Sequence, residues 1–332
     1  MTGKKRILSG NRPTGKLHWG HYFGALTNWV RLQDEYDCFY FVADLHALTT
    51  GYEHTDVIAP SVADMLKDWL AVGLDPKKSV IFIQSWVPEH SELHLLLSMI
   101  TPLGWLERVP SFKDMQQQLA DRDLNMYGFL GYPLLQAADI VMYLADFVPV
   151  GEDQLSHLEF ARELVRRFHF ITKREVFVEP QPMLTEAARV PGIDGRKMSK
   201  SFGNAIFIAD DDETIRQKMM QTITDPARKR RQDPGNPDVC NIFAYHKLFS
   251  SKEQVAWVDR ECRHAGIGCV ECKKICIENA LAFWRPIREK RAQWDGREKE
   301  LLAIAREGSQ RAREVAVKTM TSVREIMGLV YE

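Results

Sequence analysis

The chain has 332 residues, which at roughly 100 to 200 residues per domain predicts two domains, or one large domain with an appendage, and excludes a single small module. Hydrophobic residues make up 45% of it and charged residues 27%, a composition that excludes a disordered or fibrous chain. The net charge of −1 argues against a generic coat for nucleic acid. The charge is uneven, at −4 over residues 1–200 and +3 over residues 201–332, so contact with a polyanion is expected in the second part.

The first residues and the apolar runs bear on location. The basic start, Met1 to Arg6, leads into a short strand-like run and not into the apolar core of about 7 to 15 residues that a secretory signal has. No run approaches the roughly 20 apolar residues of a membrane span. We therefore expect a cytoplasmic protein.

Strands and helices are predicted to alternate through the first half of the chain. Residues 6–10 form a predicted strand, followed by a tight loop and a helix that begins at Leu17 or His18. Residues 38–44 and 79–84 are almost continuously apolar, as buried parallel strands are, and residues 56–72 between them keep a helical period. This alternation predicts a parallel α/β sheet with right-handed crossovers.

The later segments continue the pattern and then change. A helix opens at Gly131-Tyr132-Pro133, residues 147–150 form a predicted strand, and residues 153–168 a long helix. After Lys200 the segments look helical, with proline breaks between them: 212–223, 242–250, 252–265, 272–294 and 298–327. An α/β domain is therefore expected first and a helical domain second, with the boundary near residue 200.

The loop after the first strand carries the first chemical motif, Pro13-Thr14-Gly15-Lys16-Leu17-His18-Trp19-Gly20-His21. Its two imidazoles, at i and i+3, share one face of a first helical turn. Ligands of open α/β sheets bind at the carboxyl ends of strands, and a helix N-terminus offers free N–H groups to a phosphate. Gly20 has no side chain, so a flat base can lie against the backbone there. Metal ligation, or two surface histidines, is the competing interpretation.

A second motif, Lys197-Met198-Ser199-Lys200-Ser201, follows a glycine-bounded segment. Two lysines flanked by hydroxyls on a loop can close over a triphosphate and neutralise the charge that moves onto a leaving pyrophosphate. Taken alone, the motif also fits a solvated basic loop. The two motifs together favour a nucleotide site.

The two motifs resemble the signatures of the class I aminoacyl-tRNA synthetases, a HIGH-type tetrapeptide, here His18-Trp19-Gly20-His21, and a KMSKS loop, matched in full at 197–201. The chain is more specifically similar to the bacterial tryptophanyl-tRNA synthetases, over essentially its whole length. Five stretches carry that likeness: SGNRPTG at 9–15, DLHALT at 44–49, YPLLQAADI at 132–140, PVGEDQ at 149–154 and VREIMGL at 323–329.

The resemblance implies a tryptophan–tRNA ligase with sites for ATP and tryptophan. Asp139 would accept the indole N–H, Tyr132 and Gln154 would fix the amino and carboxylate groups, and His46 would lie beside the ring. Positioning and charge stabilisation by His18, His21, Lys197 and Lys200 would supply catalysis without a side-chain nucleophile. ATP, with Mg²⁺, would be held by Ser9, Gly10, Arg12, Pro13, Thr14, Gly20, His21, Gly151, Glu152, Asp153, Val190, Lys197, Met198, Ser199, Lys200 and Ser201.

The neighbours of Asp139 support a binding role. They are mostly apolar, so an unpaired carboxylate would be costly there and needs a donor. A nearby arginine or a helix cap is the alternative partner. Because a site built to bond a substrate N–H rejects an analogue without it by roughly 10⁴ to 10⁵, phenylalanine is expected to be excluded without editing.

Two other functions fit part of the pattern. Tyrosyl-tRNA synthetases share the fold, but they usually carry another glycine and a serine before the aspartate of the segment at 151–154. A non-catalytic RNA-binding or iron–sulfur sensor protein with this fold has no need of both intact motifs. Three residues depart from the usual tryptophan pattern: Trp19 replaces an aliphatic residue, His21 a frequent asparagine and Gln136 a common methionine.

Five of the six cysteines fall within the 37 residues from Cys240 to Cys276, which in a reducing compartment indicates metal ligation and not disulfides. Cys240, Cys262, Cys269 and Cys272 are the candidate ligands, for zinc or for a [4Fe–4S] cluster. A subset of tryptophanyl-tRNA synthetases has a four-cysteine iron–sulfur site with nearly this spacing, which favours the cluster. Cys276 is a spare thiol that could replace one ligand, and free thiols are the remaining alternative.

The resemblance completes the expected architecture. It implies a Rossmann-like parallel-sheet catalytic domain at 1–196, an α-helical anticodon-binding domain with the KMSKS loop at 197–297, and a last helix, about 298–332, that packs back on the first domain. The cysteine site is expected to order a surface that reads tRNA(Trp), with the basic run at 228–231 as a further phosphate contact. A homodimer is also implied.

Overall fold

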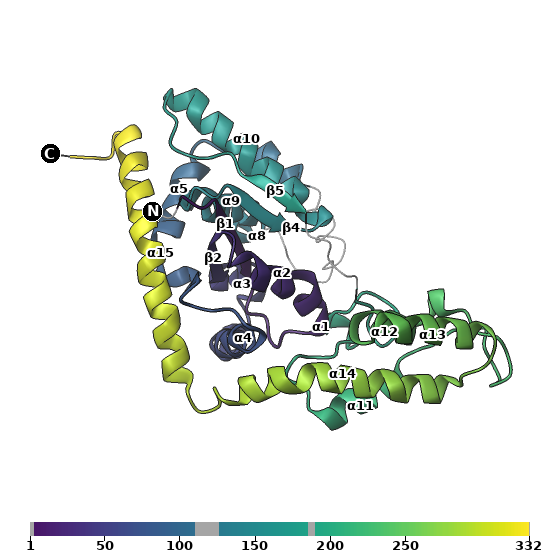
Figure 1. Ribbon diagram of the computed structural model, residues 1–332. Coiled ribbons are helices and arrows are strands. Elements are labelled where there is room, and N and C mark those ends of the chain that lie inside the picture. Colours follow the sequence, from purple (N-terminus) through teal and green to yellow (C-terminus); the bar gives the residue numbers. More distant parts are fainter. Residues whose placement is uncertain (1–2, 110–125, 185–189, 332) are drawn as a thin grey trace.

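The computed structural model describes residues 3–109, 126–184 and 190–331, but not the side chain of Asp153, an expected nucleotide-binding residue. Its centre is the predicted parallel α/β sheet, with five strands in the order β3-β2-β1-β4-β5 (Figure 1). All neighbouring strands are parallel. The strands are β1 (Arg6–Asn11), β2 (Asp37–Val42), β3 (Ser79–Ile83), β4 (Phe147–Val150) and β5 (Gln181–Leu184).

Two details of the sheet differ from the prediction. The edge strand β5 was not predicted, because it is short, largely exposed and contains Pro182, a residue that sheets tolerate at an edge. Strand β2 ends at Val42, two residues before the predicted end. Asp44 instead begins helix α3 (Asp44–Gly51), where its Oδ1 accepts the N–H groups of Leu45 and Ser85.

Both faces of the sheet are covered, because successive strand residues point to opposite sides and nearly all of them are apolar. One set, including Ile7 and Tyr40, packs with α1 (Trp19–His21), a π-helical turn (Tyr22–Leu26), α2 (Thr27–Leu32) and α4 (Ile58–Val72). The other set, including Leu8 and Phe39, packs with α5 (Glu89–Ser98), α6 (Leu103–Glu107), α8 (Tyr127–Leu130), α9 (Tyr132–Met142) and α10 (Leu155–Thr172).

The predicted helices after residue 200 are present and lie to one side of the sheet (green in Figure 1). Two begin at capping side chains: Asp211 accepts the N–H of Thr214, and Ser251 accepts that of Gln254. These helices are α11 (Asp212–Gln221), α12 (Asn241–Phe249), α13 (Lys252–Arg263) and α14 (Cys269–Ala292).

Helix α15 (Glu298–Ile326) returns along the edge of the sheet beside β3 (yellow in Figure 1). Ser309 accepts the N–H of Ile83 at 3.3 Å, so the helix satisfies a donor of the edge strand. A side chain at Gly308 would come within 1.8 Å of the carbonyl oxygen of Ile81. Glycine therefore lets the helix backbone rest directly on the strand.

An aromatic contact joins the helical region to the first motif. The ring of Trp19 is fully buried and stacks on Trp284 of α14, with centroids 5.5 Å apart and planes at 10°. Tyr245 and Phe249 of α12 pack edge-on against the same ring. Trp19, which stands where this family usually has an aliphatic residue, therefore fills the junction between the two regions.

Candidate active site

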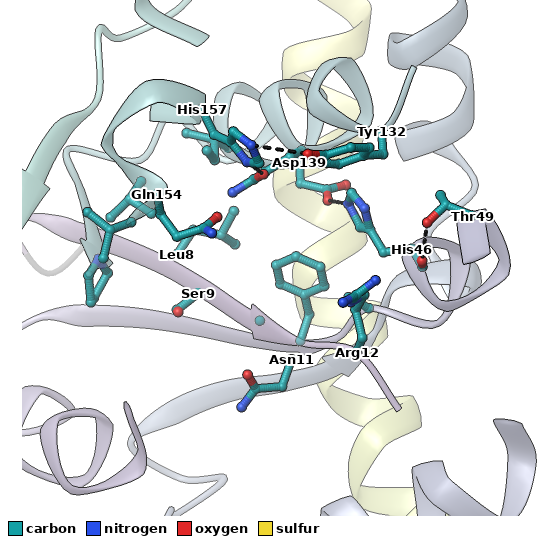
Figure 2. Close-up of a pocket in the computed structure, with 18 residues that line it drawn as sticks. Leu8, Ser9, Asn11, Arg12, His46, Thr49, Tyr132, Asp139, Gln154 and His157 are labelled. Atoms are coloured by element: carbon teal, nitrogen blue, oxygen red, sulfur yellow. Dashed lines mark hydrogen bonds and ion pairs between the residues drawn. The ribbon is translucent and has the colours of Figure 1, made fainter. Parts of the chain in front are cut away.

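A cavity of about 410 Å³ opens at the carboxyl ends of β1 and β4. Strand order reverses between these two strands, and open α/β sheets bind their ligands at such a switch point. Four of the predicted binding residues, Tyr132, Asp139, Gln154 and His46, line it together with Arg12 (Figure 2). The rest of its wall comes from Leu8, Ser9, Gly10, Asn11, Phe41, Ala43, Thr49, Gln136, Ile140, Val148, Pro149, Val150 and His157.

Asp139 is the buried acid of this cavity, with 1% of its surface exposed. Its Oδ2 lies 2.8 Å from His46 Nε2, and its Oδ1 lies 2.6 Å from His90 Nδ1. Gln84 Nε2 donates to both oxygens, at 2.8 and 2.9 Å. The expected alternative of an arginine or a helix cap as its partner is wrong, because two histidines and an amide supply the donors.

These contacts set the charge of Asp139. Burial alone would raise its pKa, but the charge of His90 and the hydrogen bonds from His46 and His90 lower the pKa to about 2. The carboxyl is therefore ionised at neutral pH, and an ionised carboxylate can only accept hydrogen bonds. This is the state that a bond from an indole N–H requires.

Helix α9, which also carries Asp139, builds another part of the wall together with the first turn of α10. Tyr132 Oη lies 3.3 Å from His157 Nε2, and His157 Nδ1 lies 2.7 Å from Gln136 Oε1 (Figure 2). His157 is thus held between two residues of α9. The sequence analysis singled out Gln136 as a departure but missed its buried partner His157, although His157 follows Gln154 by three residues.

The two histidines of the first motif face each other at the start of α1. Their ring centroids are 3.7 Å apart, and the backbone N–H of His18 donates to His21 Nδ1 at 3.1 Å. Burial lowers the pKa of His18 to about 4, and the charges of Lys200 and Lys197 add to that effect. Burial, His18 and the same lysines also lower the pKa of His21 well below its usual value. Both rings are therefore neutral at pH 7.

The second motif lies against the first. Lys200 Nζ donates to the carbonyl oxygen and to Oγ1 of Thr14, at 2.9 and 3.1 Å. Gly20 is close-packed as well, because a Cβ there would lie 2.9 Å from the His18 ring and 3.8 Å from the Met198 side chain. Burial lowers the pKa of Lys200, and the nearby charge of Arg12 lowers it further. The structure thus brings together the two predicted motifs.

Asn204, which the sequence analysis did not single out, holds the second motif in shape. Its Oδ1 accepts the backbone N–H of Ser199, while its Nδ2 donates to Asp194 and to the carbonyl of Lys197. It is 2% exposed. Beside it, the carbonyl of Val190 accepts the N–H of Met198. Within the same motif, the hydroxyls of Ser199 and Ser201 hydrogen-bond each other. The other predicted nucleotide-binding segment begins at Gly151, directly after β4, and continues in the turn Glu152–Gln154.

The four candidate cysteine ligands are half-buried and lie near one another. Burial, together with the other three thiols, Cys240, Cys262 and Cys269, raises the pKa of Cys272 to about 12. No group of three or more His, Cys, Asp or Glu side chains that could hold a metal ion occurs within residues 3–109, 126–184 and 190–331. Cys276 is fully buried in the hydrophobic core, and its Sγ contacts the carbonyl of Ile242.

The basic run at 228–231 only partly matches its expected role in phosphate contact. Arg228 turns inward: its Nη1 lies 3.9 and 3.8 Å from the sulfurs of Cys262 and Cys269, and its Nη2 donates to two backbone carbonyls. Arg231 donates to the carbonyls of Ala265 and Gly266. These arginines therefore hold the loop before Cys269, while Lys229 and Arg230 stay exposed.

No helix of the described ranges is long and apolar enough to cross a membrane.

Comparison with known proteins is consistent with this geometry. The model for class I tRNA synthetases (W and Y) matches residues 1–284. The chain is 50% identical to the tryptophan–tRNA ligase of Thermotoga maritima, over 98% of this chain and 100% of that one. It is 45% identical to the enzyme of Ralstonia nicotianae, over 98% and 99%. The crystal structure of the Campylobacter jejuni tryptophanyl-tRNA synthetase with ADP and tryptophan is similar, with a TM-score of 0.88 and 34% identity over 97% and 99%. The chain therefore belongs to the tryptophan–tRNA ligases, within the class I tRNA synthetases for tryptophan and tyrosine.

Proposed function

We propose that this chain activates L-tryptophan with ATP and transfers it to tRNA(Trp). The observation that carries the proposal is the ionised, buried Asp139 in a switch-point cavity. In the first step an oxygen of the tryptophan carboxylate attacks the α-phosphorus of ATP, the bond to the bridging oxygen breaks, and pyrophosphate leaves. In the second step a terminal ribose hydroxyl of tRNA attacks the carbonyl carbon of the adenylate, and AMP leaves.

The tryptophan subsite is assigned to the cavity. Asp139 accepts the indole N–H, and His46, which bonds the same carboxylate, lies beside the ring. Tyr132, which lies on α9 with Asp139, and Gln154 hold the amino and carboxylate groups. The support for these roles is that all four side chains line one cavity, together with apolar residues such as Leu8, Phe41 and Ile140.

The ATP subsite is assigned to the loops that surround this cavity. The segments 9–14, 20–21 and 151–153 would hold the nucleotide beside the 197–201 loop, with the adenosine against the backbone of Val190. Neutral imidazoles of His18 and His21 donate to phosphate oxygens, and Lys197 and Lys200 neutralise the charge that moves onto pyrophosphate. Magnesium is held mainly by substrate phosphates in such sites, and when bound it supplies further charge neutralisation there.

Amino-acid-dependent exchange of pyrophosphate into ATP tests the reaction. Exchange should require tryptophan and be absent with tyrosine alone or with no amino acid. Asp139→Asn should weaken tryptophan use far more than ATP use, because the amide no longer presents two accepting oxygens. Exchange that depends on tyrosine, or an Asp139→Asn variant with unchanged tryptophan kinetics, would overturn the assignment.

The rest of the molecule fits the tRNA part of the proposal. We assign catalysis to residues 1–196 with the last helix, and anticodon binding to residues 197–297, in a cytoplasmic homodimer. Large apolar side chains are exposed on α5, directly after it, on α6 and on α8: Leu95, Met99, Leu103 and Tyr127. A second copy of the chain would cover them. Sedimentation should therefore show a dimer that Met99→Glu dissociates, and a wild-type monomer at micromolar concentration would refute it.

The cysteine site is assigned to a [4Fe–4S] cluster, with zinc as the less favoured occupant. Zinc holds thiolates at about 2.3 Å in a tetrahedron, which puts the four sulfurs about 3.8 Å apart, whereas a cluster spans a wider set. The support for the cluster is the spacing of the four cysteines along the chain, together with thiols that lie near enough for their charges to interact. Protein purified without oxygen should contain iron, labile sulfide and visible absorbance. Stoichiometric zinc without iron would instead establish zinc.

A further inference from the structure

A layer of buried polar side chains lies behind Asp139, outside the cavity. Its members are Gln84, at the end of β3, His90 on α5, and Tyr143, directly after α9. All three are 0% exposed. None of them lines the cavity, and none matches a signature of the two motifs. Buried polar side chains are usually hydrogen-bonded. Gln84 donates through its Nε2, whereas its Oε1 has no partner among the described residues.

His90 is the centre of this layer. Its Nδ1 lies 2.6 Å from Asp139 Oδ1, and its Nε2 lies 2.7 Å from Tyr143 Oη. Both ring nitrogens are therefore engaged, so the ring cannot rotate without breaking two buried bonds. The ring also stacks on Phe82 and lies against Phe41. Apolar packing and hydrogen bonds together fix one orientation of the imidazole.

The two oxygens of Asp139 have different neighbours. Oδ1 is bonded by His90, a residue buried behind the cavity wall. Oδ2 is bonded by His46, which is itself part of the cavity wall. Gln84 bridges both oxygens from the buried side. Oδ1 is thus bonded only by residues behind the cavity wall, and Oδ2 is the oxygen that also bonds a residue of that wall.

We propose that His90, braced by Tyr143, is a positioning residue for tryptophan specificity, which holds Asp139 so that Oδ2 meets the indole N–H. This inference depends on the proposed role of Asp139. A carboxylate that can rotate or take up a proton offers the indole a weaker and misdirected acceptor. Without His90 the site should therefore lose its preference for a ligand that has the N–H, and not only its affinity.

The test compares tryptophan with its benzothiophene analogue, in which sulfur replaces the indole N–H. The measured quantity is the ratio of kcat/KM for the two amino acids in pyrophosphate exchange. His90→Phe keeps a ring but removes both bonds, and the ratio should fall on the order of 10- to 100-fold, the range for a lost bond to a charged group. The KM for ATP should stay unchanged. His90→Gln, which keeps one donor, should recover part of the ratio.

Two further variants separate the possible failures. His169→Gln alters a histidine of α10 that accepts the N–H groups of Val176 and Phe177 and is not among the partners of Asp139, and the ratio should not change. Asp139→Asn is the reference for a lost acceptor. If Asp139→Asn leaves the ratio unchanged, the proposed tryptophan subsite is wrong. If Asp139→Asn collapses the ratio while His90→Phe and His90→Gln lower the rates for both amino acids equally, His90 is only structural and this inference fails.

Discussion

Replacing Arg291 by leucine is expected to destabilise the junction between α4 and α14. Arg291 Nε lies 2.6 Å from Asp68 Oδ1, and its Nη2 lies 2.9 Å from Asp64 Oδ1. Asp68 is 1% exposed, and the backbone of Leu17, directly before His18, also hydrogen-bonds it. The arginine therefore compensates a charge that is buried next to the first motif.

The size of the effect follows from this burial. Removing one partner of a buried ion pair costs about 3 to 5 kcal/mol, because the other charge stays buried and unpaired. The bond to Asp64 adds little, since exposed pairs contribute about 0 to 1 kcal/mol. The double variant Asp68→Leu/Arg291→Leu removes both charges and should recover most of the loss. Asp64→Ala is the matched control and should lose less than about 1 kcal/mol.

The deficit should also depend on pH. Burial raises the pKa of Asp68 from 3.8 to about 6, although Arg291 acts to lower it. A carboxyl with a raised folded pKa contributes stability that is fully present below its unfolded pKa and is lost as pH rises through the folded one. Removing Arg291 raises the folded pKa further. The stability of Arg291→Leu relative to the wild type should therefore fall between about pH 5 and pH 8.

Urea unfolding at about pH 5 and about pH 8, followed by tryptophan fluorescence, measures these differences in the free energy of unfolding. The stacked rings of Trp19 and Trp284 lie at the junction between the two regions and report on its integrity. A loss below about 1 kcal/mol for Arg291→Leu at the higher pH would refute the argument. So would a double variant less stable than Arg291→Leu alone, because the buried charge would then not be the cause.

Three further predictions address other parts of the molecule. Lys200→Ala should slow adenylate formation about 10²- to 10³-fold with little change in tryptophan affinity, and a pure loss of that affinity in exchange kinetics would contradict its role on the phosphates. Gly308→Ala should cost at least about 1 to 3 kcal/mol in thermal unfolding, because its Cβ would collide with the carbonyl of Ile81, whereas Gly104→Ala has open space and serves as control. Cys269→Ser should remove iron and visible absorbance from protein purified without oxygen, and an unchanged iron content would exclude this thiol as a ligand.

The sequence predicted the location of the site, but it did not predict which side chains donate hydrogen bonds to Asp139. Parallel strands end at one edge of a sheet, so the motif after β1 and the segment after β4 had to meet there. Asp139 could be singled out because its apolar neighbours left a carboxylate in need of a donor. Its donors could not be found, because Gln84 and His90 lie 55 and 49 residues away. Gln84 reaches it from the end of β3, and His90 reaches it through the packing of α5 on α9.

Counting charges in the sequence could not show which cations of the basic run at 228–231 are free to contact a phosphate. The sequence shows four successive cations but not the direction of their side chains. Arg228 Nη2 donates to two backbone carbonyls and its Nη1 faces two thiols, so these two donor groups are directed inward. The departures Trp19 and Gln136 were visible from the sequence, but their reasons, the stack on Trp284 and the bond to His157, are contacts between distant segments.

The positive field for a polyphosphate is local, which is compatible with a net charge of −1. Among the residues that the structure describes, neither Lys197 nor Lys200 forms a salt bridge, and Lys200 is bonded only to the neutral oxygens of Thr14. A charge-assisted bond to phosphate is roughly twice as strong as a bond between neutral groups, so the nucleotide can take this ammonium from Thr14 at little cost. Burial lowers the pKa values of His18 and His21, and the same cations lower them further, so both rings are neutral. Positive charge is thereby concentrated on the loop that can follow the leaving pyrophosphate, while the histidines remain fixed, neutral donors.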